Sequence, residues 1–339
     1  DVTEFYGDVA GADSAALVET PEEAFARRIE LIRSAKETLD ISYHCVKEGE
    51  SVDCIFAEVL KAAQRGVQVR ILMDGKVSGM SGEHGYLPAA LAAHPNIQYR
   101  IYNPVDLLRP WRWNALLHDK FIIADDSGIL MGGRNLGDEY FAPPDYAGKL
   151  TYDRDVLVLH TGTGESVIPK VRAYMDTLWE AKETVTPHFS KGKLEKGRAN
   201  WPVLLETAAA WEQRYPDYYL PKVPATDAVV PTKCITLVNN PVEPYKKEPV
   251  IWHTLGELLK TGKQVDIQSP YTTAAPMTLR LFSEIAENAE GFRLLTNSMA
   301  SSPNYPAFSA YHYERKRFLK TGAELYEYQN TASIHGKSC

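Results

Sequence analysis

Along the first half of the chain, segments whose apolar residues recur at helical spacing alternate with short, mainly apolar runs. Over residues 21–38 they recur every three or four positions, as at Phe25 and Ile29, which predicts an amphipathic helix. Runs that are almost wholly aliphatic, such as 67–73, predict strands buried on both faces. Further strands are predicted at 39–43, 97–102, 121–124 and 129–131, and a helix at 55–64. This alternation is typical of an α/β fold with a parallel or mixed sheet.

The same order of elements returns in the last third of the chain, which indicates an internal duplication. The sequence therefore predicts two α/β lobes, residues 1–187 and 234–339, each a mixed sheet flanked by helices, with the active site between them. Segment 188–233, rich in Pro, Lys and Tyr, is predicted to be a connector with one helix over 203–214. In the second lobe, helices are predicted at 251–260, 278–290 and 311–321, and strands at 264–267, 292–295 and 324–328.

Each lobe places a histidine and a lysine two positions apart at the start of a predicted strand: His118 and Lys120 in the first, His335 and Lys337 in the second. Residues i and i+2 of a strand project from the same face, so imidazole and ammonium point together. One group can attack or protonate while the other holds an anion. The pairing at matching places indicates one site assembled from two halves.

The residues after the first pair extend this motif. Asp125 follows Lys120 by five positions and completes the pattern His-x-Lys-x4-Asp. Gly132-Gly133-Arg134-Asn135 comes next, where a glycine pair lets backbone approach a ligand and Asn135 offers donors.

On these motifs, supported by segments 65–70, 132–141 and 295–298, the chain resembles the phospholipase D superfamily. More narrowly it is similar to the bacterial cardiolipin synthases without long N-terminal membrane spans. The resemblance runs from about residue 20 to the last residue and is loosest across the middle segment. It implies two α/β lobes, phosphodiester chemistry, and no metal or other cofactor.

The resemblance assigns a role to each motif side chain. Lys120 and Lys337 would clamp the non-bridging phosphate oxygens, and Asn135 would add a hydrogen bond. His118 would attack phosphorus to give a phosphohistidine, while His335 would protonate the departing alcohol. The residues alone are symmetric on the order of the two histidines.

Two aspartates are expected to support these groups. A nucleophilic imidazole needs its other nitrogen oriented, and in the family a carboxylate on a later strand does this. Asp153, in the predicted strand 152–158, occupies the matching position, and Asp155 on the same strand face is the alternative. An ordinary strand-edge aspartate is the simpler interpretation of Asp153. Asp125 is expected to be architectural, fixing the strand end and loop.

The implied function is a phosphatidyltransferase that moves a phosphatidyl group onto a second phospholipid, with phosphatidylglycerol and phosphatidylethanolamine as candidate substrates. Hydrolysis to phosphatidic acid, or nuclease activity with the same histidines, are the alternatives. A net charge of −7 counts against binding nucleic acid. Because no apolar run reaches the length of a bilayer span, the expected location is peripheral, on the bacterial cell membrane.

Three further features leave alternatives open. Segment 107–113 mixes aromatic and arginine residues before the first motif; it is either an interfacial lip or a loop whose tryptophans pack on the domain. His44 follows a strand end and either lines the cleft or is incidental. Only Ser338 and Cys339 follow Lys337, where the family pattern continues to a second aspartate. We expect the native chain to continue; a true end would favour a non-catalytic lipid or anion binder.

Overall fold

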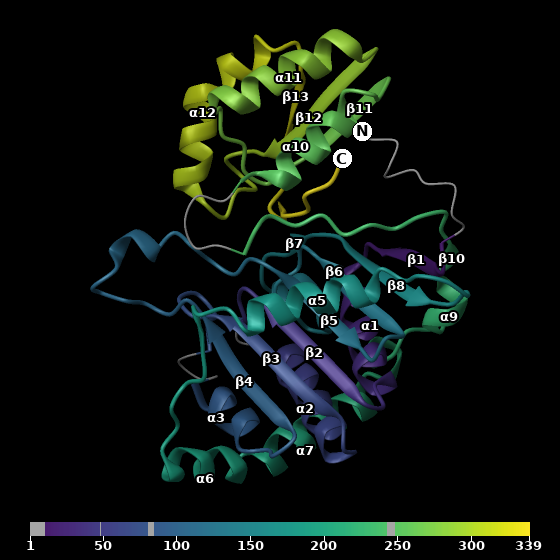
Figure 1. Cartoon of the computed structure of the whole chain (residues 1–339), viewed down its shortest axis with the longest axis vertical. Helices are drawn as coiled ribbons and strands as arrows, with labels where there is room; N and C mark the ends of the chain where they lie inside the picture. The colour runs from purple at the N-terminus through teal and green to yellow at the C-terminus, as the bar shows by residue number, and fades with distance from the viewer. Residues whose placement is uncertain (1–10, 48, 81–84, 243–247) are drawn as a thin grey trace.

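The computed structural model describes residues 11–47, 49–80, 85–242 and 248–339, which form two lobes, one above the other in Figure 1. The first lobe is built on a nine-stranded mixed sheet and the second on a three-stranded parallel sheet. Helices flank both sheets, which confirms the predicted α/β class. Among the described residues, no helix combines the length and the apolar character that crossing a bilayer requires.

The large sheet is parallel at its centre and antiparallel on both sides. Only the pairings β2–β3 and β3–β4 are parallel. In order across the sheet, the strands are β10 (Val230–Pro231), β1 (Asp13–Val18), β8 (Asp155–His160), β6 (Gly128–Gly132), β5 (Lys120–Ala124), β2 (Thr38–Tyr43), β3 (Gln68–Asp74), β4 (Ile97–Tyr102) and β9 (Thr184–Val185).

Helices cover both faces of this sheet, so the central strands are apolar on both sides, as their sequence predicts. On one face pack α1 (Pro21–Ser34), α2 (Glu50–Gln64) and α3 (Leu87–Ala92), together with helices of the middle segment. On the other face lies α5 (Ile168–Trp179), whose Ile168, Val171 and Met175 pack against Leu72 and Phe121. The short helix α4 (Asp138–Phe141) follows β6 in the chain.

The second lobe repeats the central part of the first. Its strands β11 (Gln264–Gln268), β12 (Gly291–Asn297) and β13 (Glu324–Tyr328) pair in parallel in that order. Its core includes Phe282, Phe292 and Phe318. The helices are α10 (Val250–Leu259), α11 (Pro276–Asn288) and α12 (Tyr305–Leu319).

A pair of ion pairs shows the duplication at atomic detail. Arg70 on β3 forms two hydrogen bonds with Asp40 on β2, at 2.6 and 2.8 Å. Arg293 on β12 does the same with Asp266 on β11, at 2.6 and 2.7 Å. The predicted correspondence of these strands therefore holds to the level of side-chain contacts.

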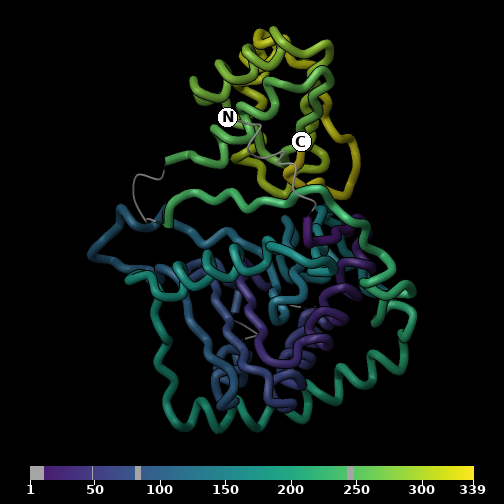
Figure 2. The backbone as a smooth tube through the Cα atoms, turned by 45° about the vertical axis from the view of Figure 1, so that its right-hand side comes forward, coloured from purple at the N-terminus to yellow at the C-terminus, as the bar shows by residue number. Residues whose placement is uncertain are grey.

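The middle segment holds more structure than the single helix predicted for it. Besides α7 (Trp201–Arg214), it forms α6 (Lys191–Ala199), α8 (Pro216–Tyr219) and α9 (Ala225–Ala228). Trp211, Tyr218 and Tyr219 surround Phe25 of α1, so this segment packs into the first lobe. After β10 the chain runs between the two lobes (Figures 1 and 2). The domain boundaries at 187 and 233 stay a prediction.

Candidate active site

The two lobes join through a short parallel ladder next to the second motif. β7 (Thr151–Tyr152) of the first lobe pairs with β14 (Ser333–Ile334) of the second, with Ile334 opposite Tyr152. The backbone N–H of His335 donates to the carbonyl of Tyr152 at 2.7 Å, which continues the ladder by one bond. The residues that follow the two strands, Asp153 and His335, therefore face each other.

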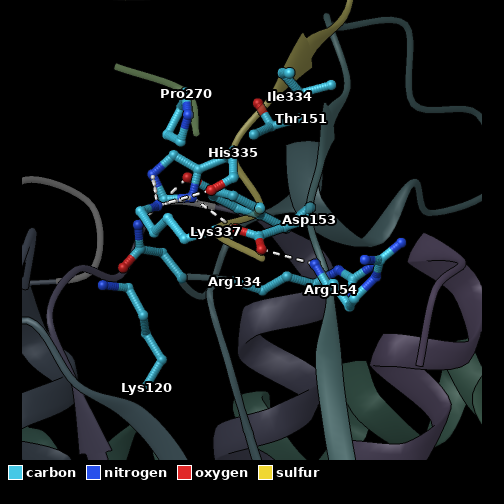
Figure 3. Close-up of polar contacts among 12 residues, drawn as sticks. Lys120, Arg134, Thr151, Asp153, Arg154, Pro270, Ile334, His335 and Lys337 are labelled. Atoms are coloured by element: carbon cyan, nitrogen blue, oxygen red, sulfur yellow. Dashed lines mark hydrogen bonds and ion pairs between the residues drawn. The ribbon is translucent and has the colours of Figure 1, made fainter. Parts of the chain in front are cut away.

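Asp153 binds His335. From the sequence, this carboxylate was expected to lie beside His118, the residue assigned as the nucleophile. Its Oδ2 lies 2.6 Å from Nδ1 of His335 (Figure 3). The difference arises because β7 pairs with β14 of the other lobe, an inter-lobe contact that the sequence does not reveal. The predicted strand 152–158 is accordingly broken, with β7 ending at Tyr152 and β8 beginning at Asp155.

Asp155, the alternative orienting carboxylate, has a structural task. It is fully buried and its Oδ2 accepts hydrogen bonds from Arg28 and Arg134, each at 3.0 Å. Arg134 also donates to the backbone carbonyl of Val18 at 2.9 Å. These bonds tie β8 and the glycine-rich loop to α1 and β1, away from the histidines.

The two lysines adopt the same local geometry. Lys120 Nζ donates to the carbonyl of His118 at 2.7 Å, and Lys337 Nζ donates to the carbonyl of His335, also at 2.7 Å. Lys120 Nζ also lies 3.1 Å from Nδ1 of His118. Lys120 begins β5, as predicted, but Lys337 follows β14 after two further residues and lies outside any regular strand. Figure 3 shows the two lysines approaching the same space from opposite lobes.

The electrostatics of the four motif side chains are coupled across the lobes. Burial, helped by the charge of Lys120, lowers the pKa of His118 to about 3, so this imidazole is neutral at pH 7. Burial and the charge of Lys337 lower the pKa of Lys120 to about 7. Burial also lowers the pKa of His335, although the hydrogen bond that its ring donates to Asp153 opposes that effect. The site is therefore an electropositive, partly desolvated pocket that an anion would relieve.

The glycine pair Gly132-Gly133, at the end of β6, allows another segment of the chain to approach closely. A Cβ on Gly133 would lie 2.2 Å from Oδ1 of Asp153, and one on Gly132 would lie 2.1 Å from Oδ1 of Asp155. The close approach predicted for a ligand is thus an approach of segment 153–155, which links β7 to β8. Asn135 is buried; its Nδ2 donates to the hydroxyl of Tyr140 at 3.3 Å, while its Oδ1 has no hydrogen-bond partner among the residues that the structure describes.

Asp125 lies at the far end of β5 from the lysine. Its carboxylate accepts the backbone N–H groups of residues 36, 37 and 38 at 2.8–2.9 Å. These bonds hold the turn between α1 and β2, and they hold the pKa of Asp125 below its usual value against the opposing effect of burial. Asp125 thus acts on the scaffold and contacts neither histidine through these bonds.

Two side chains beside the histidines were missed or left open by the sequence. The ring of Tyr140, on α4, packs edge-on against His335 with centroids 5.8 Å apart. The ring of His44 lies 4.5 Å from that of His118, and its Nδ1 lies 2.7 Å from the carbonyl of Leu117. His44 therefore lines the site. Tyr140 carried only one signal, its place in the motif-like segment after Asn135.

A cavity of about 450 Å³ adjoins the first motif. His118, Asp119 and Lys120 form one wall, and residues 237–242, in the segment that follows β10, form another. Tyr174 of α5 donates to Asp119 at 2.8 Å and closes a third side. The arrangement as a whole offers a neutral imidazole, a second imidazole paired to a carboxylate, and two lysine side chains, of which Lys120 is buried and Lys337 is exposed. That set suits nucleophilic substitution at a phosphodiester.

The comparisons with known proteins agree with this class. Residues 28–179 match the family described as "Cardiolipin synthase, PLD-like domain". This segment is therefore a phospholipase D-like domain, and the chain resembles the bacterial cardiolipin synthases.

Particular relatives extend the likeness over most of the chain. Cardiolipin synthase C of Escherichia coli is 28% identical over 334 residues, covering 91% of this chain and 68% of that protein. An uncharacterized protein of Helicobacter pylori strain J99 is 25% identical, over 94% of this chain and 66% of that protein. The chain thus spans about two thirds of the length of these relatives. The crystal structure of phosphatidylserine synthase from Haemophilus influenzae superposes with a TM-score of 0.64 at 15% identity, covering 95% of this chain and 75% of that one.

Proposed function

We propose that the protein is a phosphatidyltransferase of the cardiolipin synthase type, acting on phospholipids at the surface of a bacterial membrane. One observation carries the proposal: the histidine and lysine of the first motif, His118 and Lys120, lie close to those of the second, His335 and Lys337. Asp153 holds His335 in place through a hydrogen bond. The similarity to the protein named cardiolipin synthase C of E. coli supports a phospholipid substrate. Phosphatidylglycerol and phosphatidylethanolamine are the candidates to test.

The proposed reaction has two displacements at phosphorus. An imidazole nitrogen of His118 attacks the phosphatidyl phosphorus, the bond from phosphorus to the headgroup oxygen breaks, and His335 gives that oxygen a proton. His335 then takes the proton from the hydroxyl of the acceptor lipid, whose oxygen attacks phosphorus and releases His118. Lys120 and Lys337 offset the charge on the non-bridging oxygens throughout, with Asn135 nearby as a donor.

The contacts of the two histidines support this order of roles. Asp153 stabilises the protonated form of His335, which suits an acid and base. The charges that act most strongly on His118 are those of Lys120, His44 and Lys337, all of which favour a neutral, nucleophilic imidazole. The asymmetry of the surroundings therefore supports what the motif pattern left open.

The test is lipid product analysis with the purified full-length protein. Vesicles of phosphatidylglycerol, with and without phosphatidylethanolamine, should give cardiolipin and glycerol or ethanolamine. Labelled phospholipid, followed by rapid acid-free denaturation, should trap a covalent adduct that is stable in base and labile in acid. His118→Ala should abolish both, whereas His160→Ala, an exposed histidine on β8, should change neither.

Other outcomes would replace the proposal. Phosphatidic acid as the main product would make the protein a hydrolase. Cleavage of DNA or RNA without lipid turnover would make it a nuclease. Cardiolipin formation that survives His118→Ala would remove the phosphohistidine mechanism.

A further inference from the structure

Residues 105–113, here called the apolar loop, present large apolar side chains to solvent. Isolated exposed apolar residues are ordinary, but five within nine positions form a patch that needs an explanation. The exposed fractions are 59% for Val105, 78% for Leu107, 86% for Leu108, 64% for Trp111 and 45% for Trp113. In Figure 1 this blue segment, which includes the short helix η3 (Pro110–Arg112), extends sideways from the first lobe.

The loop is held in this position by its base. Nδ2 of Asn103 donates to the carbonyls of Arg112 and Ala115 at 3.0 and 2.7 Å. The indole N–H of Trp113 donates to the carbonyl of Asp106 at 2.9 Å, which closes the loop on itself. These bonds define the backbone, so the apolar side chains are presented outward and do not fold back onto the domain.

The base of the loop is also joined to the body of the lobe. Arg112 forms a buried ion pair with Glu183 at 2.8 Å. Lys76 Nζ donates to the carbonyl of Ala115 at 3.0 Å. Leu117 and His118 follow two residues after Ala115 and line the cavity, so these bonds join the base of the loop to the cavity wall.

The chemistry of the exposed side chains fits the interface of a phospholipid bilayer. Leucine partitions into the acyl region, while an indole prefers the headgroup boundary because its ring is apolar and its N–H is polar. Arg109, which is half exposed, adds a guanidinium suited to lipid phosphate. The loop lies on the same side of the sheet as the carboxyl end of β4 and the start of β5, where the cavity next to His118 is found.

We propose that the apolar loop is the membrane-docking element of this protein, inserting Leu107, Leu108 and Trp111 into the lipid interface beside the active site. The proposal rests on the proposed function, since lipid substrates must reach His118 from a bilayer. Docking through this loop would bring the cavity to the headgroup layer and shorten the path that a phospholipid travels out of the membrane.

Sedimentation with vesicles of phosphatidylcholine and phosphatidylglycerol tests the proposal directly. The double variant Leu107→Ser/Leu108→Ser should bind at least roughly tenfold more weakly than the wild type, because two leucines lose their apolar burial. The control is Leu17→Ser/Leu319→Ser, which removes two leucines outside the loop that are also more than half exposed (58% and 53%). It should bind like the wild type. Tryptophan emission should shift to the blue on vesicle addition, and Trp111→Phe/Trp113→Phe should remove that shift.

Four further results decide between docking and its rivals. Turnover of a short-chain phosphatidylglycerol below its micelle concentration should be the same for wild type and the Leu107/Leu108 variant, while turnover of vesicles falls. Equal vesicle binding by wild type and that variant would refute the proposal. The proposal would also be refuted if the wild type and that variant differed in oligomeric mass in the absence of lipid. That result would make the loop an interface between copies of the chain. Loop-dependent vesicle binding without any phospholipid turnover would refute the proposed function and leave docking intact.

Discussion

Asp153 and His335 share a hydrogen bond of 2.6 Å although 182 positions separate them in the chain. Asp153 is buried, with a fully buried side chain, and directly follows β7, while the histidine directly follows β14. Burial acts to raise the pKa of Asp153, but the hydrogen bond and charge of His335 hold it below its usual value. An ionised, oriented carboxylate is therefore available to support a proton on His335.

Asp153→Asn should keep the shape of this contact and remove its charge. Without the carboxylate, the imidazolium of His335 loses its partner and protonation of the leaving alcohol becomes harder. We expect kcat for natural phospholipids to fall by roughly 100-fold. Steady-state lipid transfer measures this, with Asp217→Asn, an exposed aspartate on α8, as the matched control.

The choice of leaving group separates this role from a structural one. A p-nitrophenyl phosphodiester needs no proton on departure, so Asp153→Asn should slow its cleavage much less. An equal loss on both substrates would show that the variant disturbs the whole site and that Asp153 does not act through the proton.

Activity should fall as pH rises through about 7. Lys120, with a pKa of about 7, is protonated below that pH and loses its positive charge above it, so affinity for an anionic phosphodiester weakens. Because kcat/KM reports the free enzyme, its pH profile at constant ionic strength should bend near pH 7.

A second variant assigns that bend. Lys120→Arg keeps its charge throughout and should give a lower but flat profile from pH 6 to 9. A bend that persists unchanged in Lys120→Arg would belong to another group.

Gly133→Ala should damage both stability and activity. Its Cβ would lie 2.2 Å from the Asp153 carboxylate, so that carboxylate must shift away from His335. We expect a loss of about 1–3 kcal/mol in the free energy of unfolding together with a strong loss of turnover. Gly192→Ala in α6 is the control, since its Cβ would meet nothing within 4 Å; it should gain about 0.5–1 kcal/mol. Denaturant titration measures the free energy of unfolding of each variant, and assays measure its turnover. Equal values for Gly133→Ala and Gly192→Ala would contradict the prediction.

The two duplicated ion pairs should differ in their contribution to stability. Asp40 is buried, 2% exposed in its side chain, and pairs with both Arg70 and Arg172, so Asp40→Asn removes a buried anion that two partly buried guanidinium groups share. We expect a cost of about 3 kcal/mol. Asp266 is 61% exposed, and Asp266→Asn should leave the midpoint of unfolding unchanged within error. Similar shifts in both variants would show that burial by α5 does not matter here.

Local patterns sufficed for most elements of the fold. The strands at Ile97–Tyr102 and Glu324–Tyr328 have the predicted bounds. Helix α12 begins six residues earlier than predicted, at Tyr305, because Asn304 caps it by accepting the N–H of Ala307. Such caps act through one side chain and leave no periodic trace.

The site was less accessible from sequence. The paired histidines and lysines could be found because they repeat at matching places. The partner of Asp153 could not, because β7 and β14 are only two residues each and pair across lobes. His44 reaches His118 through sheet packing, which no spacing encodes.

The ladder between β7 and β14 also bears on how the two halves can evolve. The carboxylate that serves the histidine of the second half is encoded in the first half. The histidine of the second repeat therefore relies on a residue of the first, so a mutation at Asp153 is felt in the other repeat. Duplication here has been followed by dependence of one copy on the other, and deletion of the first half would remove the carboxylate that His335 binds.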